Sequence, residues 1–439
     1  MLDTDTFCTK CGTPVEPKVQ QAAPQAPPMQ QAYQAPPQAP PMQQAAQAPP
    51  VQQAYQTPPA PGAYAAPSPV KDGVFGKAGG LFIYGALIIL MIIIGAVSSG
   101  YFTDSRNLGN IGSSLLMMLP MAFAIGITMK HKGLDMSFPA MTAITSVIIC
   151  TTPSLAAGIA ISLVVCLIFG AVNALLIHFL KLPGMLVTIT TLFITNVILS
   201  FMRVNVLQNP LRNEPGLMYV VVFIAAIVAV AIALLSSIGK DHRNKLFPTL
   251  LVYAGSGILA VLYYLALAFR VQVAIFYGSS QMLTALLFVA VFIGITRFFK
   301  SKGLGMTFAI IPSILFVIVR NVMVLTGADS FIQSLILYVF ILIMLFLQFY
   351  GGRAQLIGQN RDKMYNAKSW IGLIPLFLLI LVEIVFVVIL ISTQNSVSFG
   401  FSPALAFMSG PVIDVILLLV GVGACIVHAA AKPKGAGLV

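Results

Sequence analysis

The chain has 439 residues, of which 58% are hydrophobic and only 8% are charged. Soluble domains carry about a quarter charged residues, and apolar runs of about 20 residues recur from Gly80 onward, which is the length that crosses a bilayer. The composition therefore excludes an ordinary soluble domain and predicts an all-α polytopic membrane protein. The net charge of +12 would suit a nucleic-acid partner, but the basic residues cluster in short segments between apolar runs. That pattern is typical of the cytoplasmic connections of a membrane protein, so we expect the protein to have no nucleic-acid partner.

The first 16 residues contain a cysteine pair that is typical of a zinc knuckle. Cys8 and Cys11 are followed by Gly12, and such a turn directs two thiolates at one metal, although a closed structural site needs four ligands. No further Cys or His lies before residue 80. The segment resembles the second half of the small zinc ribbons that open many bacterial membrane proteins. Two alternatives stay open for metal, namely zinc shared between two tails or a vestigial knuckle without metal. A redox Cys-x-x-Cys is disfavoured because no βαβ pattern surrounds the pair.

Residues 17–75 predict a disordered linker rich in Pro, Gln and Ala. The segment that begins at Gln25 returns nearly unchanged at Gln38 and at Gln47. Such a sequence cannot bury a core, so we expect a flexible spacer with polyproline II character, with a docking ligand as the alternative. The first apolar run begins some 80 residues in, so we expect no cleavable signal peptide.

Apolar runs predict about twelve transmembrane helices after the linker. They lie near 80–99, 111–129, 136–152, 155–180, 184–202, 216–238, 247–269, 281–299, 305–325, 330–350, 371–391 and 410–430. The last two are the least interrupted runs of Leu, Ile and Val.

The basic residues predict the orientation of these helices. With a cytoplasmic N-terminus, one set of connecting segments holds Lys130, Lys132, Lys181, Lys240, Arg243, Lys245, Arg297, Lys300, Lys302, Arg353, Arg361, Lys363, Lys368, Lys432 and Lys434. The opposite set holds Arg106, Arg203, Arg212 and Arg270. Fifteen against four is the asymmetry that the positive-inside rule requires, and it predicts that both termini are cytoplasmic.

Short polar, Gly and Pro interruptions break the apolar sequence between Lys130 and Met202. Gly133-Leu134-Asp135-Met136-Ser137 comes first, Asn173 follows Gly170-Ala171-Val172, and Lys181-Leu182-Pro183 leads into Val187-Thr188. Irregular backbone at membrane depth is tolerated where it lines a cavity, which favours a transporter over a simple anchor.

The order of these motifs resembles the permease subunits of bacterial ABC importers for ribose, similar monosaccharides and nucleosides, to which branched-chain amino acid permeases are related. The resemblance is strongest over 110–202 and weaker over 246–350. It implies a permease-like domain over 76–350, followed over 351–439 by a cytoplasmic loop and two appended helices. It also implies a small polar solute as cargo, a second permease subunit, a separate ATP-binding subunit and an extracytoplasmic solute-binding protein. The resemblance further implies that the protein is embedded among the lipids of the bacterial inner membrane.

Four residues are candidates for the substrate pathway, each with a structural alternative. Asp135 and Ser137 either line the pathway or cap the helix that follows. Asn173 either contacts the solute or bridges helices beside small residues. Thr188 either lines the pathway or bonds to the carbonyl groups of its own helix.

The chain has no nucleotide-binding loop and no catalytic constellation, so we expect a transporter subunit and not an enzyme. The family's cytoplasmic loop after the sixth helix docks on the ATPase, but here it is reduced to residues 239–245. A permease-like scaffold, channel or sensor that is not coupled to an ATPase is therefore the alternative function.

Overall fold

The computed structural model describes residues 74–131, 133–201, 206–208, 211, 215–238, 245–270, 273–275, 279–297, 307–350, 372–394 and 411–430. The chain divides into two units, Met1–Ser68 and Pro69–Val439, and every described residue belongs to the second. The predicted knuckle at Cys8 and Cys11 lies outside the described residues, as do residues 17–73 of the predicted linker and segments 239–244 and 351–369.

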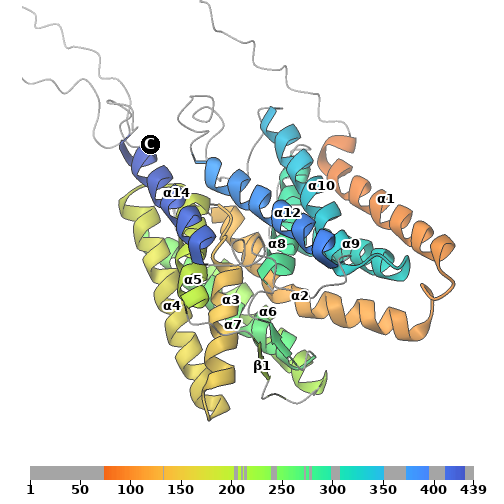
Figure 1. Cartoon of the computed structure of the whole chain (residues 1–439), viewed down its shortest axis with the longest axis horizontal. Coiled ribbons are helices and arrows are strands. Elements are labelled where there is room, and N and C mark those ends of the chain that lie inside the picture. The colour runs from red at the N-terminus through yellow and green to blue at the C-terminus, as the bar shows by residue number, and fades with distance from the viewer. Residues whose placement is uncertain are drawn as a thin grey trace, which may run out of the picture. The chain divides into compact units, whose positions relative to one another are not determined.

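The described part of the chain contains twelve α-helices (Figure 1). They are α1 (Val74–Ser98), α2 (Ser105–His131), α3 (Phe138–Thr151), α4 (Leu155–Phe179), α5 (Gly184–Phe201), α6 (Pro215–Ser236), α7 (Leu246–Ala268), α8 (Ser279–Arg297), α9 (Thr307–Leu325), α10 (Ser330–Tyr350), α12 (Ile374–Gln394) and α14 (Pro411–Ala430). Each coincides with one predicted apolar run. The largest differences are at α1 and α2, which begin six residues before the apolar runs at 80 and 111.

Two short strands depart from the all-α prediction. β1 (Val206–Gln208) pairs antiparallel with β2 (Val273–Ile275), with Val206 opposite Ile275. Three-residue strands carry too little periodicity to be distinguished in an apolar sequence. Their pairing places the segment after α5 beside the segment after α7.

Contacts between helix ends show how α2, α7 and α9 are oriented. His131 at the end of α2 lies 3.0 Å from the hydroxyl of Thr249 at the start of α7. At the other end of both helices, Arg270 donates to Ser114 at 2.8 Å, so α2 and α7 are antiparallel. Asn107 near the start of α2 and Asn321 near the end of α9 exchange two side-chain hydrogen bonds of 3.1 and 2.8 Å. The end of α9 therefore lies beside the start of α2.

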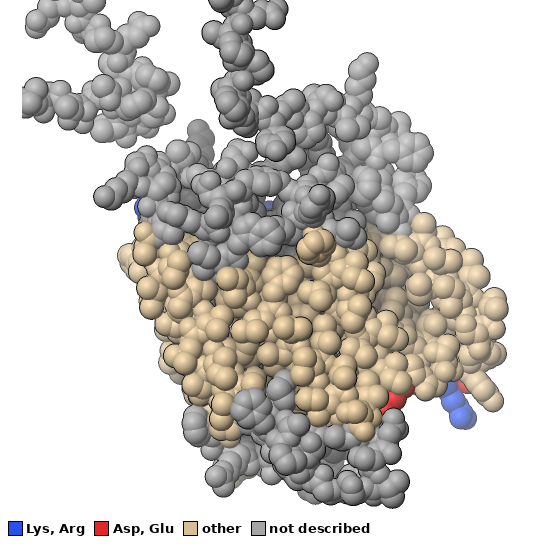
Figure 2. Space-filling view, turned by 45° about the horizontal axis from the view of Figure 1, so that its top comes forward, with Lys and Arg blue, Asp and Glu red and all other residues tan. Residues whose placement is uncertain are grey.

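Six of the described helices are long and apolar enough to cross a membrane: α2, α4, α6, α7, α12 and α14. The apolar stretches of the other six are shorter. Large hydrophobic side chains such as Phe179 and Phe223 are 65% and 66% exposed on the outer faces of α4 and α6. Figure 2 shows a broad uncharged surface, with charged side chains at its margins. This is the surface of a multi-pass membrane protein.

A close crossing of α4 and α7 holds the centre of the bundle together. A Cβ atom on Gly170 would lie 2.3 Å from the carbonyl oxygen of Tyr253, and one on Gly257 would lie 2.5 Å from that of Cys166. Only glycine permits this approach of two backbones, which is the usual means of tight helix packing in membranes. The crossing holds the backbones of α4 and α7 in direct contact at Gly170 and Gly257.

Candidate functional site

The connection between α2 and α3 is a buried interruption and not a surface loop. Residues Gly133 to Ser137 are all buried. Gly133 adopts a φ of 130°, which side chains disfavour, and its N–H donates to Thr128 at 3.1 Å to close the end of α2. α3 has only 14 residues, or about 21 Å, which is shorter than a hydrocarbon core of about 30 Å. The interruption therefore lies within the bundle.

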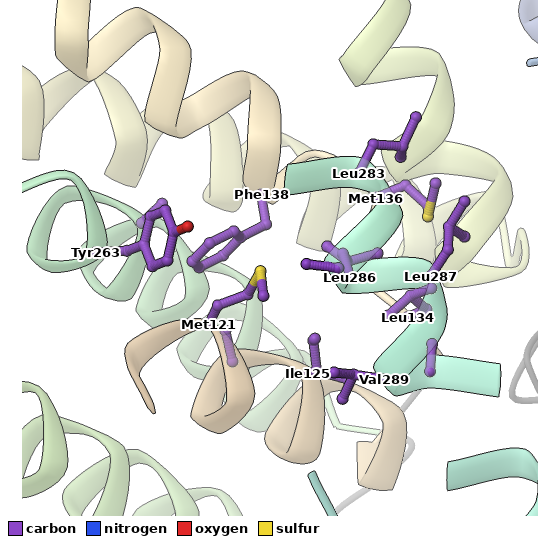
Figure 3. Packing of buried hydrophobic residues seen from close by; sticks show 14 of the residues in the cluster. Met121, Ile125, Leu134, Met136, Phe138, Tyr263, Leu283, Leu286, Leu287 and Val289 are labelled. Carbon is purple, nitrogen blue, oxygen red and sulfur yellow. The ribbon is translucent and has the colours of Figure 1, made fainter. Parts of the chain in front are cut away.

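Side chains alternate between two environments along this interruption. Leu134, Met136 and Phe138 are each no more than 1% exposed and belong to the hydrophobic core. Figure 3 shows them among side chains of α2, α7 and α8, with Phe138 facing Tyr263, at 5.7 Å between ring centroids. Asp135 and Ser137, between them in sequence, take part in a separate polar network.

The polar network joins the interruption to α4 and α5. The N–H and the hydroxyl of Ser137 both donate to Oδ1 of Asp135, at 2.9 and 2.5 Å. Asn173 of α4 donates through Nδ2 to Oγ of Ser137 at 3.0 Å. Oδ1 of Asn173 accepts a hydrogen bond from Thr191 of α5. Three of the four predicted residues thus form one connected chain of hydrogen bonds.

Thr188, the fourth predicted residue, fixes the backbone of the interruption. Its Oγ1 accepts the N–H of Met136 at 2.9 Å and lies 3.2 Å from the carbonyl oxygen of Leu134. It also lies 2.9 Å from the carbonyl oxygen of Gly184 in its own helix. The predicted bond within the helix is therefore present, and a tertiary contact is added to it.

The predicted cap of α3 is not formed as a cap. Ser137 occupies the N-cap position but has helical angles, φ −79° and ψ −10°, and makes no side-chain capping bond. Its hydroxyl is directed to Asp135 instead. Asp135 accepts the N–H of Ser137, which precedes the helix, and not an N–H of its first turn. Proline at position 139 removes one of the donors that a cap would serve.

Two residues of α7 complete the site, and the sequence analysis did not single them out. The hydroxyl of Tyr253 donates to the carbonyl oxygen of Gly133 at 3.3 Å. Ser256 faces the carboxyl group of Asp135. The available signal was the segment Tyr253-Ala254-Gly255-Ser256-Gly257, where polar and small residues interrupt an apolar run. We call the set Asp135, Ser137, Asn173, Thr188, Thr191, Tyr253 and Ser256 the polar junction.

Asp135 is the only ionisable carboxyl group of the polar junction, and it is 2% exposed. Its Oδ1 accepts two hydrogen bonds from Ser137, and the hydroxyl of Ser256 lies near the carboxyl group. Oδ2 of Asp135 has no hydrogen-bond partner among the described residues, and neither has Oγ of Ser256. The junction therefore holds two buried oxygen atoms with unused hydrogen-bonding capacity.

A second polar group links the C-terminal helices to the rest of the bundle. Ser200 of α5 donates to Oδ2 of Asp414 in α14. Glu383 of α12 and Thr284 of α8 each hydrogen-bond with Tyr338 of α10. α14 packs on α5 and α12 packs on α10 (Figure 1), so both predicted appended helices contact the preceding domain.

No three His, Cys, Asp or Glu side chains gather as a metal site in the part of the chain that the structure describes. The polar junction is instead a network of hydroxyl, amide and carboxyl groups around the interruption between α2 and α3. Such a site, in a chain with several membrane-length apolar helices, defines the class as a polytopic helical membrane protein with an internal polar site. No protein-family model, curated protein or solved structure matches the chain.

Proposed function

We propose that this chain is the transmembrane permease subunit of an ABC-type importer. Its cargo would be a small polar solute of the sugar or nucleoside class, and a separate ATPase would supply the energy. The observation that carries the proposal is the polar junction: the motif residues Asp135, Ser137, Asn173 and Thr188 come from three segments of the chain and converge around one buried helix interruption.

The chemistry of the junction supports a polar solute. Carboxylate, amide and hydroxyl groups are the groups that exchange hydrogen bonds with sugar hydroxyls. Discontinuous helices near the middle of the membrane are where transporters place their binding sites. All the junction side chains are buried in this arrangement, with Asn173 and Thr188 both 0% exposed, so solute entry requires α7 or α4 to separate from the interruption.

The same proposal includes the location, the topology and the partners of the protein. The protein would lie in the bacterial inner membrane with about twelve spans and both termini in the cytoplasm. Its partners would be membrane lipids, a second permease subunit, an ATP-binding subunit and an extracytoplasmic solute-binding protein. No nucleic acid and no enzymatic activity of its own are part of the proposal.

One observation favours the second candidate, a permease-like scaffold, channel or sensor without an ATPase. α6 ends at Ser236 and α7 begins at Leu246, so the connection that should dock on the ATPase consists of residues 237–245 alone. A connection of this length leaves little surface for a partner protein.

Uptake measurements distinguish the two candidates. Cells with and without the gene are compared for uptake of labelled sugars and nucleosides, and the purified chain is examined for a bound ATPase. For the solute found, Asn173→Ala should abolish most uptake per molecule of protein. Asn107→Ala is the matched control, because it removes another interhelical amide bridge, to Asn321, outside the junction.

The permease proposal fails if deletion changes the uptake of none of the solutes and no ATPase copurifies. Equal uptake per molecule in Asn173→Ala and Asn107→Ala would show that the junction is structural only. The scaffold, channel or sensor function would then take the place of the permease.

A further inference from the structure

The buried face of α4 carries only small or polar side chains between the start of the helix and Ala174. These residues recur every three or four positions and therefore share one side of the helix: Gly158, Ser162, Cys166, Gly170, Asn173 and Ala174. The opposite side carries large apolar groups such as Ile168, which is 57% exposed. Because Asn173 belongs to the polar junction, the buried face leads from the junction toward the Leu155 end of α4. Ser162 lies about 16 Å along the helix from Asn173.

Close helix packing accounts for the glycines of this face but not for Ser162. A Cβ atom on Gly158 would lie 3.2 Å from the Cα atom of Ile149 in α3, and one on Gly170 would meet the backbone of α7. Alanine in place of Ser162 would allow an equally close approach. The side chain of Ser162 is 0% exposed, and its Oγ has no hydrogen-bond partner among the residues that the structure describes. An unpaired buried hydroxyl group is destabilising, so packing does not explain why a serine is here.

α3 presents polar side chains to the same face of α4, and the two helices lie side by side with α7 (Figure 1). Oγ1 of Thr145 lies 3.4 Å from Sγ of Cys166. Together with the contact of Gly158 near the end of α3, this makes α3 and α4 antiparallel and brings Ser162 level with Ser146 of α3. The side chain of Ser146 is also buried, and its Oγ forms no hydrogen bond of standard geometry with a described residue.

Polar groups continue from Ser146 to the last turn of α3. Sγ of Cys150 lies 3.3 Å from the hydroxyl oxygen of Tyr264 in α7, and Ser146 lies near both groups. Cys150 is partly exposed. Hydroxyl and thiol groups from α3, α4 and α7 therefore extend from the end of α3 toward the polar junction. The contacts of Thr145 with Cys166 and of Cys150 with Tyr264 close this row in the present arrangement.

We propose that this row lines the route by which the solute reaches the polar junction from the Leu155 end of α4. We call it the access row, and its members are Thr145, Ser146, Cys150, Ser162, Cys166 and Tyr264. The inference rests on the proposed transport function and assigns the route to the same site. In the proposed topology this end of α4 is extracytoplasmic. The unpaired hydroxyl groups of Ser146 and Ser162 exchange hydrogen bonds with the solute as it passes. A thiol is a weak hydrogen-bonding group, so the parting of Thr145 from Cys166 costs little.

Thiol labelling of Cys166 tests the route. A full-length variant with Cys166 as its only cysteine is expressed in cells, and a small, positively charged methanethiosulfonate reagent is applied from outside. The matched control has no native cysteine and carries Ile168→Cys, two residues further along α4 on the exposed apolar side. A variant with Cys425 as its only cysteine is the second control. Its thiol also lies beside a threonine, Thr190, between two helices, but outside the access row.

Cys166 should react at least about tenfold faster than either control, because the charged reagent and the reactive thiolate both require water, which the lipid-facing side lacks. Exposure in the present arrangement predicts the opposite order, since Cys166 is 0% exposed and Ile168 is 57% exposed. The route is wrong if Cys166 reacts no faster than Ile168→Cys or Cys425.

Labelling requires no solute, so the route and the permease function can fail separately. Solute uptake by a chain whose Cys166 is not labelled would refute the route alone. A labelled Cys166 in a chain that takes up none of the tested solutes would refute the permease function and retain a water-accessible path into the bundle.

Discussion

Nδ2 of Asn173 in α4 lies 3.0 Å from Oγ of Ser137, a residue 36 positions earlier in the chain, and the carbonyl oxygen of the same amide accepts from Thr191 of α5. Both functional ends of one buried amide are therefore occupied by different elements. Asn173 bridges α4, α5 and the helix interruption, so its structural role and its proposed pathway role reside in the same side chain.

Asn173 and Ser137 should be energetically coupled. Asn173→Ala and Ser137→Ala each remove the same hydrogen bond, so their effects on the free energy of unfolding should not add, with a coupling energy of about 0.5–3 kcal/mol. Reversible unfolding in mixed micelles, followed by circular dichroism, measures the four proteins of the cycle. The pair Asn173→Ala and Asn107→Ala is the control and should be additive, because Asn107 bonds to Asn321 instead. Additivity in both pairs would contradict the bridge.

Thr188→Val should destabilise the protein by about 1–3 kcal/mol, because it leaves the buried N–H of Met136 without its acceptor. Thr188→Ser keeps the hydroxyl and should recover most of the loss. Thr151→Val is the control: the Thr151 hydroxyl bonds only within α3 at 2.7 Å, on an exposed residue. Thermal unfolding of the purified variants measures the difference. An equal effect of the two valine substitutions would show that the tertiary bond adds nothing.

Gly170→Ala should lower both the abundance and the thermal stability of the protein. The added methyl group would meet the backbone of Tyr253 and Ala254 at 2.3 and 2.6 Å, and overpacking of this kind costs about 1–3 kcal/mol. In α2, Gly112→Ala is the matched control, because nothing lies within 4 Å of a Cβ atom there. Membrane-fraction abundance and melting temperature are the measurements. Normal values for Gly170→Ala would mean that α4 and α7 do not cross at this point.

Cysteine labelling tests the orientation of the bundle. Tyr101, between α1 and α2, and Lys245, before α7, are both exposed and belong to the opposite sets of connections that the basic residues define. In a background without the native cysteines, an impermeant reagent applied to intact cells should label Tyr101→Cys and not Lys245→Cys. Permeabilised cells, in which both should react, are the control. The reverse pattern would invert the proposed topology.

The positions of the helices were accessible from the sequence. A long apolar run in lipid must satisfy its backbone hydrogen bonds internally, which only a helix does within one segment, and each predicted run is a helix. The polar first turn of α2, from Ser105 to Asn110, was missed because hydropathy marks the apolar region and not the whole helix. The strands β1 and β2 were missed because their pairing joins segments more than 60 residues apart.

The polar residues of the motif, Asp135, Ser137, Asn173 and Thr188, were also evident from the sequence. What each polar group bonds to was not. Ser256 of α7 lies near Asp135, more than 100 residues earlier in the chain, and Gly170 and Gly257 let α4 and α7 cross closely; both are relationships between distant segments. Sequence determined where the chain is helical and where it is interrupted, because those features depend on local hydrogen bonding and hydropathy. Only the tertiary structure decided which buried polar atoms have a hydrogen-bond partner and which have none, because burial and hydrogen-bond partners depend on the packing of segments far apart in the chain.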